Sequence, residues 1–413
     1  MLLKSRHRGK LGKKQEAAKV TAMNRSTIVF LIWGLGGIFS ASQASAEGEQ
    51  WLRYNYGPDT RQAGASMHSL KATKDRPAGV ALPDFNDSQP MFAVWESPMA
   101  KGGKVHIAMD RSVKEKGFNL LYIDSDCDGS LKDETAVKTN SKDEYYNTFG
   151  PVKVLLEGDD GPAAYHLNFM LYLNDAAMPR LYAMSGCWYE GMITVGGEKR
   201  RCVLNDAGAD GAFNNTSKNY YEADRIVIGG GSNEVTALAG KFLQVSGKLY
   251  RLEVARDGAY IKTGPADDAV LGVIKMPSEI SELTATGENG FLKVLPKNGT
   301  GSIPEGKYRI HQWVIERNDG KGSNWKLEGE DFGESGDFEV KKGGTAYLAV
   351  GEPLTSKTGV QVKRGKYSFE HSLTGRLGER ATLVRNNERA PAPKLHVVSK
   401  DGTFNRSYNF EFG

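Results

Sequence analysis

The 413-residue chain contains only three cysteines, Cys127, Cys187 and Cys202. Three thiols permit at most one disulfide, so the fold is not built on a disulfide framework. Long runs with helical spacing of apolar residues are absent, and so is any apolar run of the about 20 residues that a membrane-spanning helix needs. We therefore expect neither a helical bundle nor a membrane span.

The first 46 residues have the pattern of an export signal. Basic residues precede the apolar run TIVFLIWGLGGIF, and the small residues after it end in ASA, which predicts cleavage after Ala46. Met23 is an alternative start. The basic residues of this segment are Lys4, Arg6, Arg8, Lys10, Lys13, Lys14, Lys19 and Arg25. We expect an exported protein, located in the periplasm, at the cell surface or outside the cell, with no membrane span once the signal is removed.

The small basic excess of the chain comes from this leader. The chain has 54 basic and 50 acidic residues, of which the leader holds eight and one. The remaining chain has 46 basic against 49 acidic residues, a net charge of −3. Without a basic surface, nucleic acid is not an expected partner.

Alternation of apolar and polar residues predicts an all-β protein. In YHLNFMLYL, every second residue from Tyr165 to Leu173 is apolar, which is typical of a half-buried strand. Asp-Gly and Asn-Gly pairs between such runs are strong hairpin signals. We divide the chain into a signal peptide (1–46), an irregular arm (47–90), a β domain (91–274) and a C-terminal β-sandwich (275–413). The pairs begin at Asp128, Asp160, Asp210, Asp257, Asn289, Asn298, Asp319 and Asp401.

One strand of the C-terminal module carries an irregularity in its alternation. In SIPEGKYRIHQWVIER, Tyr308 and Ile310 share one phase, whereas Trp313 and Ile315 follow the other. A shift of one residue near His311 predicts a β-bulge. The segment IPEGKY resembles a turn of transthyretin-like and carboxypeptidase-regulatory-like modules, and this resemblance implies an antiparallel sandwich of immunoglobulin or transthyretin type.

The cysteines do not define a disulfide. If the Gly-Gly pair at 196–197 is a two-residue hairpin turn, Cys202 lies opposite Gly191 and not opposite Cys187. The offset of four residues corresponds to about 13 Å along a strand, beyond the Cα separation of about 7 Å that a disulfide tolerates. A longer turn or a pairing with Cys127 would change this result, so the connectivity stays open.

The segment NLLYIDSDCDGSLKDE contains a candidate cation loop. Acidic residues occupy positions 1, 3 and 5, glycine follows at position 6, and Ser130 offers its carbonyl at position 7; the acids are Asp124, Asp126 and Asp128. This spacing resembles EF-hand and dockerin-type calcium loops, in which alternate residues point their oxygens at one hard cation. Position 12 is Thr135 instead of the usual glutamate, and Glu134 is expected to close the site. We predict weak calcium binding, with a dissociation constant of about 10⁻⁴ to 10⁻³ M.

A second loop repeats part of this pattern. In RRCVLNDAGADGAFNN, Asp206 and Asp210 match positions 1 and 5, Ala212 supplies the carbonyl at position 7, and Asn214 falls at position 9. Asp224 can return to this loop from the strand that follows. The alternative for either loop is a plain Asp/Gly turn held by hydrogen bonds of the aspartate side chain.

No catalytic set accompanies these loops. The chain has no nucleophile elbow and no glycine-rich phosphate loop leading into a helix. We therefore expect a non-enzymatic exported β-protein with a calcium-stapled N-terminal module and a recognition or attachment role, with a cell-surface glycan or an envelope protein as its partner. The alternative is a carbohydrate-binding or carbohydrate-active protein, because aromatic residues such as Trp188 and Trp325 suit sugar platforms.

Overall fold

The computed structural model describes residues 48–411, apart from 59–65, 114, 116, 144, 174–178 and 231–233. The predicted signal peptide lies outside these residues. Strands dominate the described chain, and short 3₁₀ turns such as Lys101–Gly103 and Glu334–Gly336 stand in for helices. The prediction of an all-β protein is confirmed. In the part of the chain described, no helix has the length and apolar character that a membrane crossing requires.

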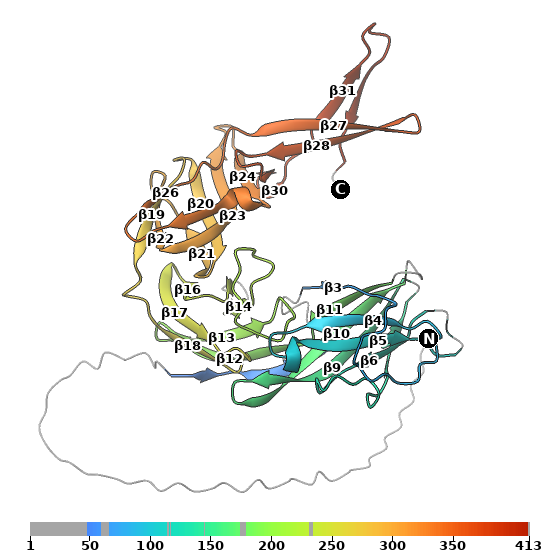
Figure 1. Ribbon diagram of the computed structural model, residues 1–413. Helices are drawn as coiled ribbons and strands as arrows, with labels where there is room; N and C mark the ends of the chain where they lie inside the picture. The colour runs from blue at the N-terminus through green and yellow to red at the C-terminus, as the bar shows by residue number, and fades with distance from the viewer. Residues whose placement is uncertain are drawn as a thin grey trace, which may run out of the picture. The chain divides into compact units, whose positions relative to one another are not determined.

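Four antiparallel sheets form the first part of the chain (Figure 1). One four-stranded sheet contains both strands that flank the first acidic loop, and one five-stranded sheet contains the long hairpin 146–172. The four-stranded one is ordered β4 (Met91–Glu96), β5 (Lys104–Asp110), β6 (Leu120–Ile123) and β7 (Val137–Lys138). The five-stranded one is ordered β3 (His68–Leu70), β11 (Arg180–Ser185), β10 (Gly161–Tyr172), β9 (Tyr146–Gly158) and β8 (Ser141–Lys142).

Of the other two sheets, the five-stranded one contains both strands that flank the second acidic loop. One is ordered β15 (Val235–Leu238), β14 (Arg225–Ile228), β13 (Glu198–Asn205), β12 (Cys187–Val195) and β2 (Arg53–Tyr56). The other is ordered β1 (Gln50–Trp51), β18 (Tyr260–Pro265), β17 (Lys248–Val254) and β16 (Phe242–Val245). Three of these strands, β1, β2 and β3, come from the segment 47–90. What the sequence presents as an irregular arm therefore also supplies an outer strand to each of three sheets.

One continuous hydrophobic core joins the four sheets. Its buried members run from Leu52 to Ile261, and β10 contributes Tyr165, Leu167 and Phe169, all at most 2% exposed. The alternation that predicts β10 thus does place one face of the strand in the core. Apolar burial of this kind is the main favourable term in folding. A satellite cluster of Phe92, Ala108 and Leu131 lies beside it, with side chains of the segment 80–85 packed against it.

A second core begins at Ile274 and is lined by residues of two further sheets. The finer assignment of this part to an immunoglobulin- or transthyretin-like sandwich stays a prediction. The smaller sheet is ordered β22 (Thr300–Pro304), β19 (Leu271–Lys275) and β26 (Thr345–Tyr347). The larger is ordered β21 (Gly290–Val294), β20 (Ile280–Gly287), β23 (Gly306–Asn318), β24 (Asn324–Glu330), β29 (Arg380–Arg385), β28 (Lys366–Thr374) and β27 (Thr355–Lys363), with β25 (Asp337–Val340) on β23 and β30 (Glu388–Arg389) on β29. A separate hairpin, β31 (Lys394–Val398) and β32 (Asn405–Asn409), follows them.

Two local predictions are confirmed by strand register. Between β20 and β23, Thr284 pairs with Gln312 and Ala285 with Ile310, so His311 is the extra residue of a β-bulge. Between β12 and β13, Cys202 pairs with Gly191. All three cysteines are free and buried.

The glycine-containing turns also lie where the sequence places them. Asp160, Asp257 and Asp319 each lie in the turn of a two-stranded hairpin. Asn298 and Gly299 both have positive φ, 48° and 72°, which is the conformation of a tight primed turn. Asp128 and Asp210 are exceptions, because their Asp-Gly pairs lie in longer loops after β6 and β13.

Candidate metal centre

The first acidic loop begins where β6 ends and closes before β7. Ile123 is buried, and the backbone N–H of Asp124 still donates to the carbonyl of His106 on β5, at 3.0 Å. The strand therefore delivers the Asp124 side chain to the edge of the core, where it is 1% exposed. Leu131 is fully buried, and its N–H donates to the carbonyl of Ala81 at 2.7 Å. The loop is thus attached to the segment 80–85 as well as to its own sheet.

The buried aspartate organises the turn that follows it. Its two carboxylate oxygens accept the N–H groups of Asp128, at 3.0 Å, and Gly129, at 3.1 Å. Gly129 has a φ of 85°, and Cys127 lies in the same left-handed region at 58°. A glycine suits position 129 because the left-handed conformation costs it little. The backbone therefore turns around the Asp124 carboxylate.

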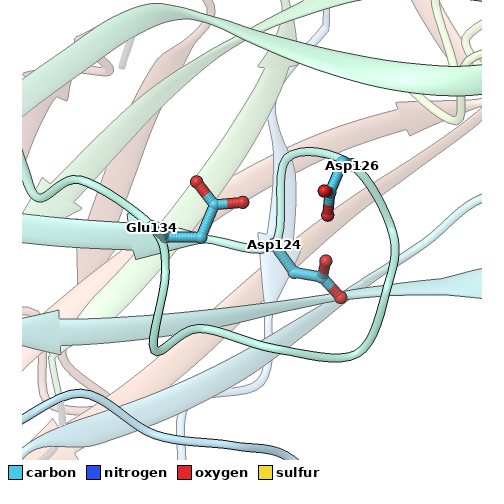
Figure 2. Close-up of side chains that lie close together, drawn as sticks. All are labelled: Asp124, Asp126 and Glu134. Carbon is cyan, nitrogen blue, oxygen red and sulfur yellow. The ribbon is translucent and has the colours of Figure 1, made fainter.

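Three carboxylates meet in this loop. Ligand oxygens of Asp124, Asp126 and Glu134 all lie within 4.8 Å of one another, the only such group of acidic, histidine or cysteine side chains found among the described residues. Figure 2 shows Asp124 and Asp126 projecting into the ring of the loop, with Glu134 where the loop returns. Asp124 is buried, Glu134 is half-buried and Asp126 is exposed. We call this group the first-loop triad.

The electrostatics of the triad favour a bound cation. Burial, opposed by the two backbone N–H donors and supported by the charges of Asp128 and Asp126, raises the pKa of Asp124 to about 6. Burial also raises the pKa of Glu134, and the backbone N–H and hydroxyl of Ser125 donate to it and oppose that rise. Negative charges held this close in a partly buried loop repel each other, and a cation between them removes the repulsion.

The structure separates the other predicted residues of this loop from the triad. The carboxylate of Asp128 accepts the N–H of Ser130 at 2.7 Å. The Ser130 hydroxyl in turn donates to Asp133 at 2.6 Å. These hydrogen bonds shape the second half of the loop and leave the triad to Asp124, Asp126 and Glu134. The roles of Asp128 and of the Ser130 carbonyl as ligands stay predictions.

Chemically, the triad suits a hard divalent cation. Calcium and magnesium prefer carboxylate oxygens, and calcium accepts the irregular arrangements that a loop offers more readily than magnesium does. Oxygen ligands alone therefore fit either ion, and the choice of calcium belongs to the proposal below.

The second acidic loop places its predicted residues differently. Asp206 follows β13 and is fully buried; its Oδ2 accepts the N–H of Gly211 at 2.8 Å and the hydroxyl of Tyr165 at 2.7 Å. Asp210 accepts the N–H of Ala212 at 3.0 Å. Ala212 itself is buried, whereas Asn214 is exposed at the surface.

Asp224 and Asn215 complete this second loop. Asp224 is buried, and its two oxygens accept the N–H groups of Ala207, at 3.0 Å, and Asn215, at 2.7 Å. The Asn215 amide donates to Asp210 at 2.8 Å. Burial raises the pKa of both Asp206 and Asp224, and the neighbouring carboxylates add to each rise.

Sequence reasoning missed several of these contacts. It assigned Asn214 by counting positions in an EF-hand loop, whereas the contact is made one residue later by Asn215. It also missed Ser125 and Tyr165, because a hydroxyl that donates to a carboxylate has no spacing signature. Tyr165 reaches Asp206 from a strand 41 residues away in the chain.

Comparison of the chain with protein-family models, with curated proteins and with solved structures finds no match.

Proposed function

We propose that this chain is an exported, non-enzymatic β-protein whose N-terminal domain is stapled by calcium at the first-loop triad, and whose C-terminal sheets serve recognition or attachment at a cell surface. The observation that carries the proposal is the convergence of Asp124, Asp126 and Glu134 within 4.8 Å. The rest of the proposal rests on the leader sequence and on the absence of a catalytic set in the sequence.

A cation at the triad acts as a staple because of where the three residues lie. Asp124 directly follows β6, and Glu134 precedes β7, so one ion ties the two ends of the loop together. The loop carries Leu131, a fully buried member of the satellite cluster. Binding to the folded state alone stabilises that state in proportion to the logarithm of cation concentration. The predicted weak affinity suits the millimolar calcium available outside cells.

The recognition role is supported by an exposed sheet surface. In the hairpin of β27 and β28, Val360, Val362 and Tyr367 are each more than half exposed. β27 is also the last strand of its sheet, so one of its edges has no neighbouring strand in the described chain. Exposed apolar residues beside an open strand edge favour docking of a partner.

The test of the staple is direct calcium binding. Isothermal titration of the chelator-treated full chain should show binding that Glu134→Gln weakens at least tenfold. Gln keeps an oxygen for the Ser125 N–H, so the loop retains that hydrogen bond. Asp159→Asn is the matched control, because Asp159 is an exposed carboxylate in the turn between β9 and β10. Equal calcium affinity in the wild type and in Glu134→Gln would refute the site.

The test of export is the N-terminus of the mature protein. Expression of the full chain in a secreting bacterium, followed by N-terminal sequencing, should give Glu47 as the first residue. A chain that keeps its leader and stays inside the cell would contradict the export part of the proposal without affecting the cation site.

A further inference from the structure

The second acidic loop holds buried negative charge without a positive partner. Asp206 and Asp224 are both 0% exposed, and Asp210 lies beside them. The groups that donate hydrogen bonds to these carboxylates are neutral: backbone N–H groups, the Tyr165 hydroxyl and the Asn215 amide. Ionised groups buried without compensation cost several kcal/mol each, so something must balance this charge.

One oxygen of this group has no partner. The Oδ1 atom of Asp206 is buried and accepts no hydrogen bond. It faces the space beside the α-carbon of Gly208, because a methyl group added there would lie 3.6 Å from Asp206 Oδ1, 3.7 Å from the Asn215 side-chain nitrogen and 3.9 Å from the Asp210 carboxyl carbon. Two carboxylates thus border one small space that the missing side chain of Gly208 leaves open.

A proton is one way to balance this charge, because burial and the neighbouring carboxylates raise the pKa of both Asp206 and Asp224. Both oxygens of Asp224 and Oδ2 of Asp206 already accept hydrogen bonds, which favour the ionised carboxylate. A water molecule would satisfy the oxygen and leave the charge uncompensated. A cation balances the charge and also binds Oδ1 of Asp206, which has no hydrogen-bond partner.

We propose that the second loop binds a hard divalent cation in the space beside Gly208, with Asp206 and Asp210 as ligands and Asp224 as the third carboxylate whose charge it balances. The site is separate from the first-loop triad, and it keeps positions 1 and 5 of the EF-hand count without the residues at positions 7 and 9. Asp206 takes part through its unpartnered Oδ1, while its Oδ2 is held by Gly211 and Tyr165. Calcium is the probe, because carboxylate ligands at irregular spacing suit it.

The experiment counts bound calcium in the full chain. Equilibrium dialysis or titration calorimetry should give two calcium ions for the wild type, and one each for Asp206→Asn and Glu134→Gln. The double variant should bind none. If the first loop fails and the second holds, the wild type binds one ion that Asp206→Asn removes and Glu134→Gln does not. The two proposals therefore fail in distinguishable ways.

Gly208→Ala tests the location of the ion without removing a carboxylate. The added methyl makes only ordinary van der Waals contacts at 3.6 to 3.9 Å, so the loop is expected to fold. It takes up part of the space in which the proposed cation lies, and calcium affinity at this site should fall at least tenfold. Gly264→Ala is the matched control, because a methyl group there meets nothing within 4 Å. Unchanged affinity in Gly208→Ala would overturn the location.

Terbium luminescence supplies a readout that needs no variant of the acidic residues. Trp95 donates its indole N–H to the carbonyl of Ala209 at 2.6 Å, and its ring stacks on Tyr165 with centroids 5.7 Å apart. Terbium bound at the second loop should therefore emit when tryptophan is excited, also in Glu134→Gln. Absence of this emission in Glu134→Gln, or a bound calcium ion that survives Asp206→Asn, would overturn the proposal.

Discussion

Asp126→Asn separates the stabilisation by a cation from the stability of the cation-free fold. Asp126 is the exposed member of the triad, and its Oδ1 accepts only a long hydrogen bond of 3.3 Å from Asp128, which an Asn oxygen can also accept. An exposed substitution of this kind changes the free energy of unfolding by no more than about 0.5 kcal/mol. In the presence of chelator, the variant should therefore unfold together with the wild type.

Calcium should then distinguish the two proteins. With a dissociation constant of about 10⁻⁴ to 10⁻³ M, about 10 mM calcium stabilises the folded state by about 1.4 to 2.7 kcal/mol. For a domain of about 150 to 250 residues, each kcal/mol raises Tm by about 2 to 4 °C. The first-loop site is thus expected to add about 3 to 11 °C to the Tm of the wild type, and this contribution should be missing in the variant.

The assay is differential scanning calorimetry of the N-terminal transition, with chelator and with about 10 mM calcium. Asp159→Asn controls for the loss of one exposed carboxylate. Any increase in Tm that Asp126→Asn retains belongs to the second loop and is removed by Asp206→Asn. The reasoning is refuted if calcium raises the Tm of Asp126→Asn as much as that of the wild type.

Three further predictions concern other parts of the chain. Burial, followed by the charge of Lys153, lowers the pKa of His166. Because the folded state then holds fewer protons than the unfolded state, this group should reduce stability as pH falls below about 6.5. In urea unfolding at pH 7 and pH 5, the free energy of unfolding should therefore fall less in His166→Gln than in the wild type. Burial raises the pKa of Cys187 to about 11 and that of Cys202 to about 12, and all three cysteines are buried. A thiol reagent should therefore label none of the three cysteines in the folded protein and all three in urea. Labelling of only one cysteine in urea would reveal a disulfide between the other two. Trp313→Phe removes the indole N–H that donates to buried Glu379 at 2.7 Å, and should lower the free energy of unfolding in urea by about 2 to 3 kcal/mol. Trp325→Phe is the control: its N–H reaches exposed Asp319 at 3.3 Å, and its loss should cost less than about 1 kcal/mol. Equal losses in the two variants would contradict the importance of the buried hydrogen bond to Glu379.

Local patterns predicted much of the fold, because strands and tight turns depend on neighbouring residues. Alternation along β10 and β23 is read from side chains that point to opposite faces at every step. The bulge at His311 appears as a change of phase within one strand, and the pairing of Cys202 with Gly191 follows from counting back from a two-residue turn. The strands of the segment 47–90 were harder to predict, because β1, β2 and β3 are short and each pairs with a strand more than 100 residues away.

For the candidate sites, the sequence by itself determined that acidic residues follow β6 and β13 with a glycine at the turn. The spacing of Asp124, Asp126 and Asp128 identified the first loop as a candidate cation site, because its chemistry lies within a few residues. Only the tertiary structure decided which carboxylates meet. Glu134 joins the triad because the loop folds back on itself, and Tyr165 reaches Asp206 because β10 passes beside the end of β13. Burial decided the rest: whether an aspartate oxygen is solvated or left bare, as Oδ1 of Asp206 is, depends on chain segments that are distant in sequence.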